Sequence, residues 1–162
     1  MPLIPDAIAN HEFIEDLSFE AIDLRASDLS GKKFYRVILK NANLTEANLS
    51  NTIFEDCDLS GALLTNVNLA AAQLINTSLL DADLQGAQAA GAHAHRANFS
   101  QSNMTSSSWT QSMFDNCQFR QTVMVAIGFE SVDCYQCQFE GADLSESRLM
   151  QWTVPDTDLS SA

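Results

Sequence analysis

The chain has 162 residues, of which 46% are hydrophobic, and a formal net charge of −13. This length is typical of one domain with a continuous core, and the negative charge excludes nucleic acid and anionic membrane as direct partners, because both would repel it. No apolar run approaches the roughly 20 residues of a membrane span, and the N-terminus lacks the basic start and apolar stretch of a signal peptide, so we expect a cytoplasmic protein.

The first eleven residues precede the regular part of the sequence. They contain the apolar residues Leu3, Ile4 and Ile8 together with Pro2 and Pro5. Regular stacked structures expose unpaired backbone at their ends and need a cap there. We expect residues 1–11 to form an N-terminal cap and residues 12–162 to form the regular domain.

From residue 14 onward, every fifth residue is apolar and the phase never slips. A helix repeats its side-chain directions every 3.6 residues and a strand every 2, so neither explains this pattern. The period predicts a structure in which one residue in five points into a core. The thirty residues are Ile14, Phe19, Leu24, Leu29, Phe34, Leu39, Leu44, Leu49, Phe54, Leu59, Leu64, Leu69, Leu74, Leu79, Leu84, Ala89, Ala94, Phe99, Met104, Trp109, Phe114, Phe119, Met124, Phe129, Cys134, Phe139, Leu144, Leu149, Val154 and Leu159.

The residues before each of these apolar positions are also restricted. The position two residues earlier is mostly small, as at Ala42, Cys57 and Ala62, which indicates a tight interior. The position directly before is often Asp or Asn, as at Asn43 and Asp58. Because such short polar side chains bond readily to nearby backbone, the chain is expected to turn every few residues.

Together these positions make up an A-(D/N)-L-x-x repeat, seen as Ala-Asn-Leu-Thr-Glu at 42–46, Ala-Asp-Leu-Gln-Gly at 82–86 and Ala-Asp-Leu-Ser-Glu at 142–146. The repeat closely resembles the pentapeptide-repeat family over residues 12 to 160. The resemblance implies an all-β solenoid, a right-handed quadrilateral β-helix with four pentads per turn, in which residues twenty apart stack about 4.8 Å apart. Thirty pentads would make about seven and a half coils and a rod roughly 36 Å long.

Residue sizes support this stacking. Ala89 and Ala94 fall one coil below the large residues Trp109 and Phe114, as volume compensation in a packed core requires. We expect small and large residues to fill one layer together. The alternative is a ligand cavity at the two alanines.

The four cysteines, Cys57, Cys117, Cys134 and Cys137, all fall on inward positions. The C-x-x-C spacing of the last two occurs in both disulfide and metal sites. Free cysteine in a core behaves as a small hydrophobe, however, and a metal needs ligands that converge on one exposed point. We therefore expect a structural role and no metal site, with a Cys117–Cys137 disulfide as the alternative.

Nothing in the sequence points to catalysis. No Walker loop, Rossmann fingerprint, H-E-x-x-H or G-x-S-x-G motif is present. His93 and His95 flank an inward residue and are expected to project outward as surface residues. Because a convex rod offers few clefts where catalytic groups could meet, we expect a protein that is not an enzyme, with no catalytic residue and no cofactor.

Charge is unevenly distributed along the chain. Five of the eight basic residues lie between residues 25 and 40, and residues 84–114 contain no acid. The acidic residues either keep a repeat protein soluble or present a negative face of roughly duplex dimensions to a DNA-binding protein. The acidic candidates for partner binding are Glu55, Asp56, Asp58, Glu130, Asp133, Glu140 and Asp143.

One branch of the family, the quinolone-resistance and mycobacterial-type proteins, looks like B-form DNA and engages DNA gyrase or topoisomerase IV. For this branch, the resemblance implies that the negative face is presented to a DNA-binding protein. The unbroken register lacks the insertions for projecting loops that the quinolone-resistance proteins use. The leading expectation is a DNA mimic that engages a type II topoisomerase. The alternative is a generic scaffold for protein–protein interaction.

Outward apolar residues define a second candidate surface. Clustered on one face, such residues mark a partner site. By the twenty-residue rule, one outward column contains Tyr35, Ile75, His95 and Tyr135, interrupted by Glu55 and Asp115.

The last pentads are irregular, because Trp152 occupies a narrow inward position and Pro155 removes a hydrogen-bond donor. The candidate dimer interface is Met150, Trp152 and Val154. We expect a homodimer through the C-terminal coils, or else a monomer in which these residues cover its open end.

Overall fold

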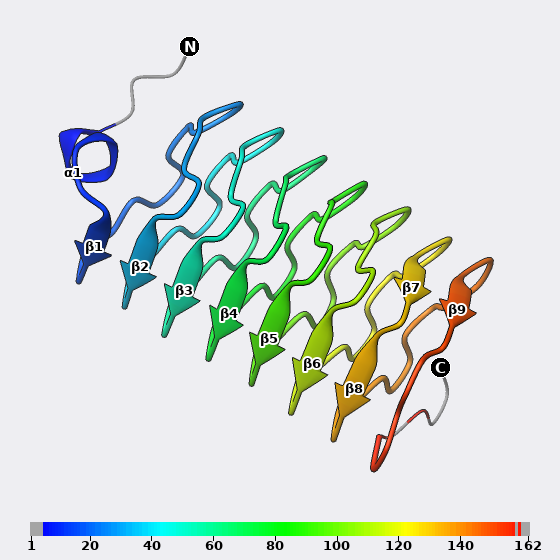
Figure 1. The fold of residues 1–162 in the computed structure, drawn as a ribbon. Helices are drawn as coiled ribbons and strands as arrows, with labels where there is room; N and C mark the ends of the chain where they lie inside the picture. The colour runs from blue at the N-terminus through cyan, green and yellow to red at the C-terminus, as the bar shows by residue number, and fades with distance from the viewer. Residues whose placement is uncertain (1–4, 158, 160–162) are drawn as a thin grey trace.

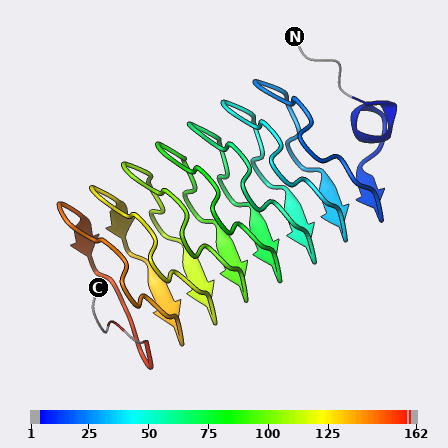
Figure 2. The ribbon, with the colours of Figure 1, turned by 180° about the vertical axis from the view of Figure 1, so that it is seen from behind.

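The protein is a stack of similar coils that runs from one end of the molecule to the other (Figures 1 and 2). The computed structural model describes residues 5–157 and residue 159. A short helix comes first and is followed by strands of three residues each. The elements are α1 (Asp6–Ala9), β1 (Phe13–Glu15), β2 (Lys33–Tyr35), β3 (Ile53–Glu55), β4 (Gln73–Ile75), β5 (His93–His95), β6 (Met113–Asp115), β7 (Gly128–Glu130), β8 (Asp133–Tyr135) and β9 (Arg148–Met150).

The strands pair in parallel with partners twenty residues away. Seven of them form one sheet in the order β1-β2-β3-β4-β5-β6-β8, and β7 pairs with β9 on another side of the rod. In the first sheet Phe34 lies opposite Phe54, and Ala94 lies opposite Phe114. The register confirms the predicted solenoid and the stacking of small residues beneath large ones.

Each coil has four faces, and each face carries one central residue that points inward. Face 1 holds β1 to β6 and β8 and is centred on Phe34 and its equivalents at twenty-residue steps. Faces 2, 3 and 4 are centred on Leu39, Leu44, Leu49 and their equivalents. Isolated parallel bridges, such as Ile38 to Asp58, join neighbouring coils on these three faces, and β7 and β9 belong to face 4.

The corners between faces explain the five-residue period. The residue two positions after each central residue has a positive φ, from Asp16 at 55° to Asp156 at 52°, which reverses the direction of the chain. The Asp or Asn before the central residue reinforces the turn. For example, the Asn43 side chain accepts a hydrogen bond from the backbone N of Thr45 at 3.1 Å, as predicted for short polar side chains at this position.

The interior is a continuous apolar core. Every central residue from Leu24 to Phe139 is buried. On face 2, Phe119 stacks on Phe99 and Phe139 with ring centroids 5.0 and 4.6 Å apart. All four cysteines are buried as free thiols, as predicted.

The two ends differ. At the N-terminal end, helix α1 places Ile8 against the core, where it is fully buried. At the other end, Leu149 and Leu159 are 38% and 40% exposed, so the expectation that all thirty central residues are interior is wrong there. Among the described residues, no further complete coil stacks on Leu149. Residues 1–4 of the expected cap, and residues 158 and 160–162 of the expected solenoid, lie outside the described residues.

Within the described part of the chain, no helix is long and apolar enough to cross a membrane.

Candidate protein-binding surface

The predicted outward column runs along the edge of face 1. The parallel registers place Tyr35 beside Glu55, Glu55 beside Ile75 and Ile75 beside His95, and they continue through Asp115 to Tyr135. Tyr35, Ile75 and His95 are half-buried, whereas Tyr135 is 39% exposed. The column is therefore contiguous, but carboxylates interrupt its apolar character.

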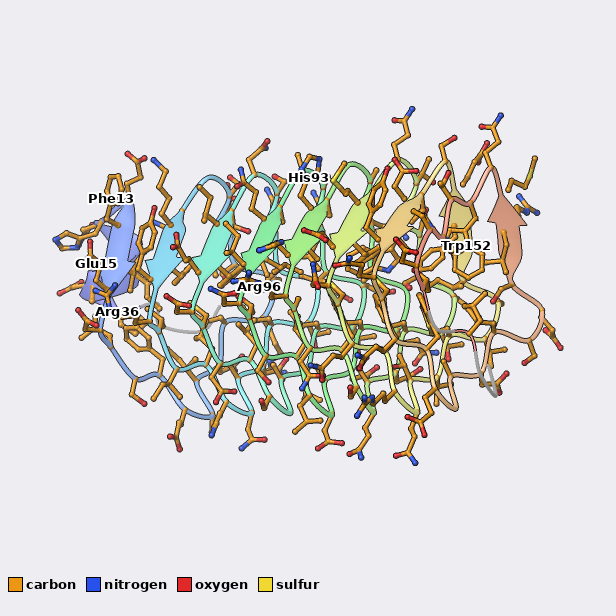
Figure 3. The ribbon with its side chains drawn as sticks, turned by 90° about the horizontal axis from the view of Figure 1, so that it is seen from below. Phe13, Glu15, Arg36, His93, Arg96 and Trp152 are labelled. Atoms are coloured by element: carbon orange, nitrogen blue, oxygen red, sulfur yellow. The ribbon has the colours of Figure 1, made fainter. Side chains whose placement is uncertain are left out.

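The histidines of β5 have different surroundings. His93 is exposed and projects away from the coil interior (Figure 3). His95 is half-buried, and its Nδ1 lies 2.7 Å from Oδ2 of Asp115. In the described residues, no group of three or more histidine, cysteine, aspartate or glutamate side chains is placed to hold a metal ion.

The acidic candidates surround the rod. Glu55 lies on face 1, Asp56 at the next corner and Asp58 on face 2 of the same coil. Near the C-terminal end, Asp133 lies on face 1 and Glu130 on face 4. Glu140 and Asp143 complete this group on faces 2 and 3. In place of the expected single negative face, the structure shows two acidic zones. One lies on faces 1 and 2 around Glu55, and the other is spread over all four faces near the C-terminal end.

Two of these carboxylates have basic neighbours. Lys40 Nζ lies 3.1 Å from Oδ2 of Asp58, and Arg120 Nε lies 3.8 Å from Oε2 of Glu140. Among the described residues, Glu130, Asp133 and Asp143 form no ion pair. Glu55 and Asp56 form none either, so five of the seven candidates carry charge that no ion pair of the described residues neutralises, and three of these five lie near the C-terminal end.

The basic N-terminal coils are largely neutralised by local pairs. Arg25 bonds to Asp23 at 2.7 Å, and Lys33 Nζ bonds to Oε1 of Glu12 at 2.7 Å. Arg36, in the coil that lies beside β1, contacts Asp16 at 2.6 Å and Glu15 at 3.6 Å (Figure 3). Because these cations are paired, the surplus charge of the protein is carried by unpaired acids along the rod.

Hydrogen bonds at the turns keep several of these acids ionised. The side chain and backbone of Ser145 hold the pKa of Asp143 below its usual range. At Asp58, partial burial opposes ionisation, but hydrogen bonds from Ser60 and the Lys40 ammonium lower its pKa overall. Both carboxylates are therefore charged at neutral pH.

The C-terminal candidates are only partly covered. Trp152 packs on the rings of Phe129 and Phe139, with centroids 5.9 and 5.7 Å away, and its Nε1 donates to Cys134 Sγ at 3.2 Å. Val154 is half-buried beside it, and Met150 is 53% exposed. Trp152 thus covers part of the end of the core and leaves an apolar margin (Figure 3).

A hollow of about 410 Å³ on face 1 was not anticipated from the sequence. Its lining residues are Met113, Asp115, Tyr135, Gln136, Pro155 and Asp156. The twenty-residue rule already aligned Asp115 with Tyr135 and Pro155, which is the signal that could have found it. What the rule does not give is the space left between their side chains.

Comparisons with known proteins agree with this geometry. The family described as pentapeptide repeats matches the chain in eight copies, over residues 18–56, 52–87 and 95–125. Among curated proteins, no relative matches the sequence.

Two solved structures illustrate the likeness. HetL, a pentapeptide repeat protein involved in heterocyst differentiation regulation from the cyanobacterium Nostoc sp. strain PCC 7120, is 16% identical with a TM-score of 0.65, over 90% of this chain and 88% of HetL. Full-length QnrB1, described as a plasmid-mediated fluoroquinolone resistance protein, is 18% identical with a TM-score of 0.65, over 88% of this chain and 84% of QnrB1. At such identities the likeness shows the fold alone.

Proposed function

Because the chain belongs to the pentapeptide-repeat family, we propose that it is a non-enzymatic binding protein that acts as a DNA mimic toward a type II topoisomerase. The observation that carries this proposal is the C-terminal acidic zone, which is spread over all four faces of the rod. A duplex is charged on all sides of its axis, and a DNA-binding groove reads that charge before it reads any base. We place this interaction in the cytoplasm.

The available carboxylates near the C-terminal end favour this function. Glu130, Asp133 and Asp143 lie on three faces within one coil of one another, and Asp143 has a lowered pKa. A basic groove that closes around the rod would meet negative charge from several directions. QnrB1 shares the fold, and its description as a fluoroquinolone resistance protein directs the choice of partner toward DNA gyrase or topoisomerase IV.

A generic interaction scaffold is the second candidate. It is favoured by the exposed side chains of Met113 and Tyr135 on face 1, which are 40% and 39% exposed. Apolar groups of this size contribute little to electrostatic mimicry and more to contact with a shaped protein surface.

A supercoiling assay with purified DNA gyrase tests the mimicry directly. We expect inhibition that is strong at low salt and weaker at moderate salt, because salt screens exposed charges over roughly 8–10 Å. The triple variant Glu130→Gln, Asp133→Asn, Asp143→Asn should lose most of this inhibition. A control triple variant, Glu20→Gln, Glu46→Gln, Asp81→Asn, removes the same charge elsewhere and should retain it.

Two results would overturn parts of the proposal. No inhibition at micromolar protein favours the scaffold. Equal loss in both triple variants means that total charge, and not the C-terminal acidic zone, controls binding.

We also propose that the protein forms a homodimer through its C-terminal coils. Leu149 and Met150 expose apolar surface beside the half-buried Trp152, and pairing two such ends would remove it from water. Sedimentation velocity should show a dimer that Leu149→Arg converts to a monomer of unchanged far-UV circular dichroism. A monomeric parent protein would contradict this assignment.

A further inference from the structure

The hollow on face 1 spans three successive coils near the C-terminal end. Met113 and Asp115 come from β6, Tyr135 from β8, and Pro155 and Asp156 from the segment that follows β9. That segment is held in place by backbone bonds from Cys134 N to Thr153 O at 2.7 Å and from Gln136 N to Pro155 O at 3.3 Å. The hollow is thus formed by hydrogen-bonded coils and is present before any partner arrives.

Its floor and sides are apolar and include an aromatic ring. Met113 is 40% exposed and Tyr135 is 39% exposed, and both flank the inward residue of their strand. Pro155 stands next to Tyr135 in the same outward column, one coil further along. The thioether of Met113 and the rings of Tyr135 and Pro155 together form a flat surface that a partly apolar group can contact.

Its rim is acidic, and one carboxylate is fixed in orientation. Oδ2 of Asp115 lies 2.7 Å from Nδ1 of His95, and Oδ1 accepts a hydrogen bond from Nδ2 of Asn116 at 2.8 Å. A carboxylate can accept about four hydrogen bonds, so Asp115 keeps acceptor positions free while its direction is set. Asp156 is exposed on the opposite rim and forms no ion pair with any other described residue.

We propose that this hollow binds an arginine side chain of a protein partner. A guanidinium group is planar and weakly hydrated, so it stacks on a tyrosine ring and donates to carboxylates in the same plane. Its methylene stem would lie on Met113 and Pro155, while Asp115 and Asp156 accept its N–H groups. None of the lining residues is basic, and the basic side chain His95, outside the lining, contacts only Oδ2 of Asp115 and leaves Asp156 free for the guanidinium.

This inference rests on the proposed function as a binding protein, but not on the identity of the partner. It predicts that a single arginine in a short peptide is recognised in the absence of any topoisomerase. If the peptide does not bind, the proposal of DNA mimicry is unaffected. If gyrase is not inhibited, the proposal that the hollow binds arginine is unaffected.

The test follows the ε-methyl group of Met113 by ¹³C NMR while the peptide acetyl-Gly-Ser-Arg-Ser-Gly-amide is titrated into the full chain. The chain has five methionines, so the signals are few and are assigned by substitution. We expect a saturable shift at Met113 and none at Met150, which lies on face 4. The same peptide with citrulline, or with lysine, should bind about tenfold more weakly, because it lacks the charge or the planar fork.

Matched variants separate the hollow from general electrostatics. Asp156→Asn and Tyr135→Leu should each weaken arginine-peptide binding several-fold. Asp81→Asn removes the same charge from a distant coil, and Phe13→Leu removes an exposed aromatic ring from β1 on the same face, and both should bind as the parent does. All four positions are at the surface, and the core methyl signals of Met104 and Met124 report whether each variant remains folded.

Three outcomes would overturn the proposal. These are the absence of a saturable shift at Met113, equal binding of the lysine peptide, and equal weakening by Asp156→Asn and Asp81→Asn.

Discussion

Replacing Phe119 with alanine should weaken the solenoid locally and strongly. The Phe119 ring is fully buried and is stacked between Phe99 and Phe139, at 5.0 and 4.6 Å, with a third contact to Phe114 at 5.1 Å. The substitution therefore removes the stacking contacts to both neighbouring rings at once. The coils cannot close the gap, because backbone hydrogen bonds on all four faces fix the distance between them.

The expected loss of unfolding free energy is about 3–5 kcal/mol, the range for a buried phenylalanine whose cavity does not collapse. With a urea dependence of about 2 kcal/mol per M, the unfolding midpoint should fall by roughly 2 M. Since each coil contacts only its neighbours, the effect should be largest from residue 119 onward. Hydrogen exchange should show faster exchange at the Met124 and Gln138 amides and little change at Leu44.

Val123→Ala provides the control, because Val123 lies in the same region but is 42% exposed. It should change stability by no more than about 0.5 kcal/mol. A loss of less than about 1 kcal/mol for Phe119→Ala, or an equal fall in protection at Leu44 and Gln138, would contradict a tightly packed stack in which each coil contacts only its neighbours.

Three further predictions follow from the same structure. Burial raises the pKa of the Cys57 thiol to about 11 and that of Cys117 well above its usual value. All four thiols are buried, so they should resist Ellman's reagent at pH 8 in the folded protein and react in urea, and rapid reaction of the native protein would contradict this. The lowered pKa values of Asp58 and Asp143 stabilise the fold above the unfolded pKa of about 3.9. Melting temperature should therefore hold between pH 7 and 5 and decline as pH falls below about 4, whereas a rise on acidification would show the opposite sign. Trp152→Ala should destabilise the last coils by about 2 kcal/mol, because the residue is only half-buried, and hydrogen exchange at Thr153 and Gln136 should detect it.

The interior could be predicted from the sequence because one rule governs it. A residue in the core is fixed by its place in the pentad, and Trp109 and Phe114 fall where the small residues Ala89 and Ala94 leave room. The rule fails at the C-terminal end, where Leu149 has the correct phase but is 38% exposed, because no complete coil of the described residues stacks on it. Helix α1 was also out of reach, because four residues are too few to show a helical period.

Surface contacts were harder to predict because they depend on diagonal neighbours. Some contacts join residues that are eighteen apart, such as Lys40 with Asp58 and Thr65 with Asp83. In each pair, the first residue follows the central residue of its face, and the second precedes the central residue of the same face in the next coil. The twenty-residue rule aligns columns and does not describe these diagonals. It therefore identified the column through Tyr135 but neither the pairing of Asp58 nor the hollow beside Pro155.

The central claim is that the protein binds its partner in place of DNA. Biolayer interferometry with immobilised DNA gyrase, with and without a saturating linear duplex, tests this most directly. We predict binding that weakens as salt increases and that the duplex abolishes, because both ligands need the same basic groove. Binding that persists on the DNA-saturated enzyme, or no binding at low salt, would contradict mimicry.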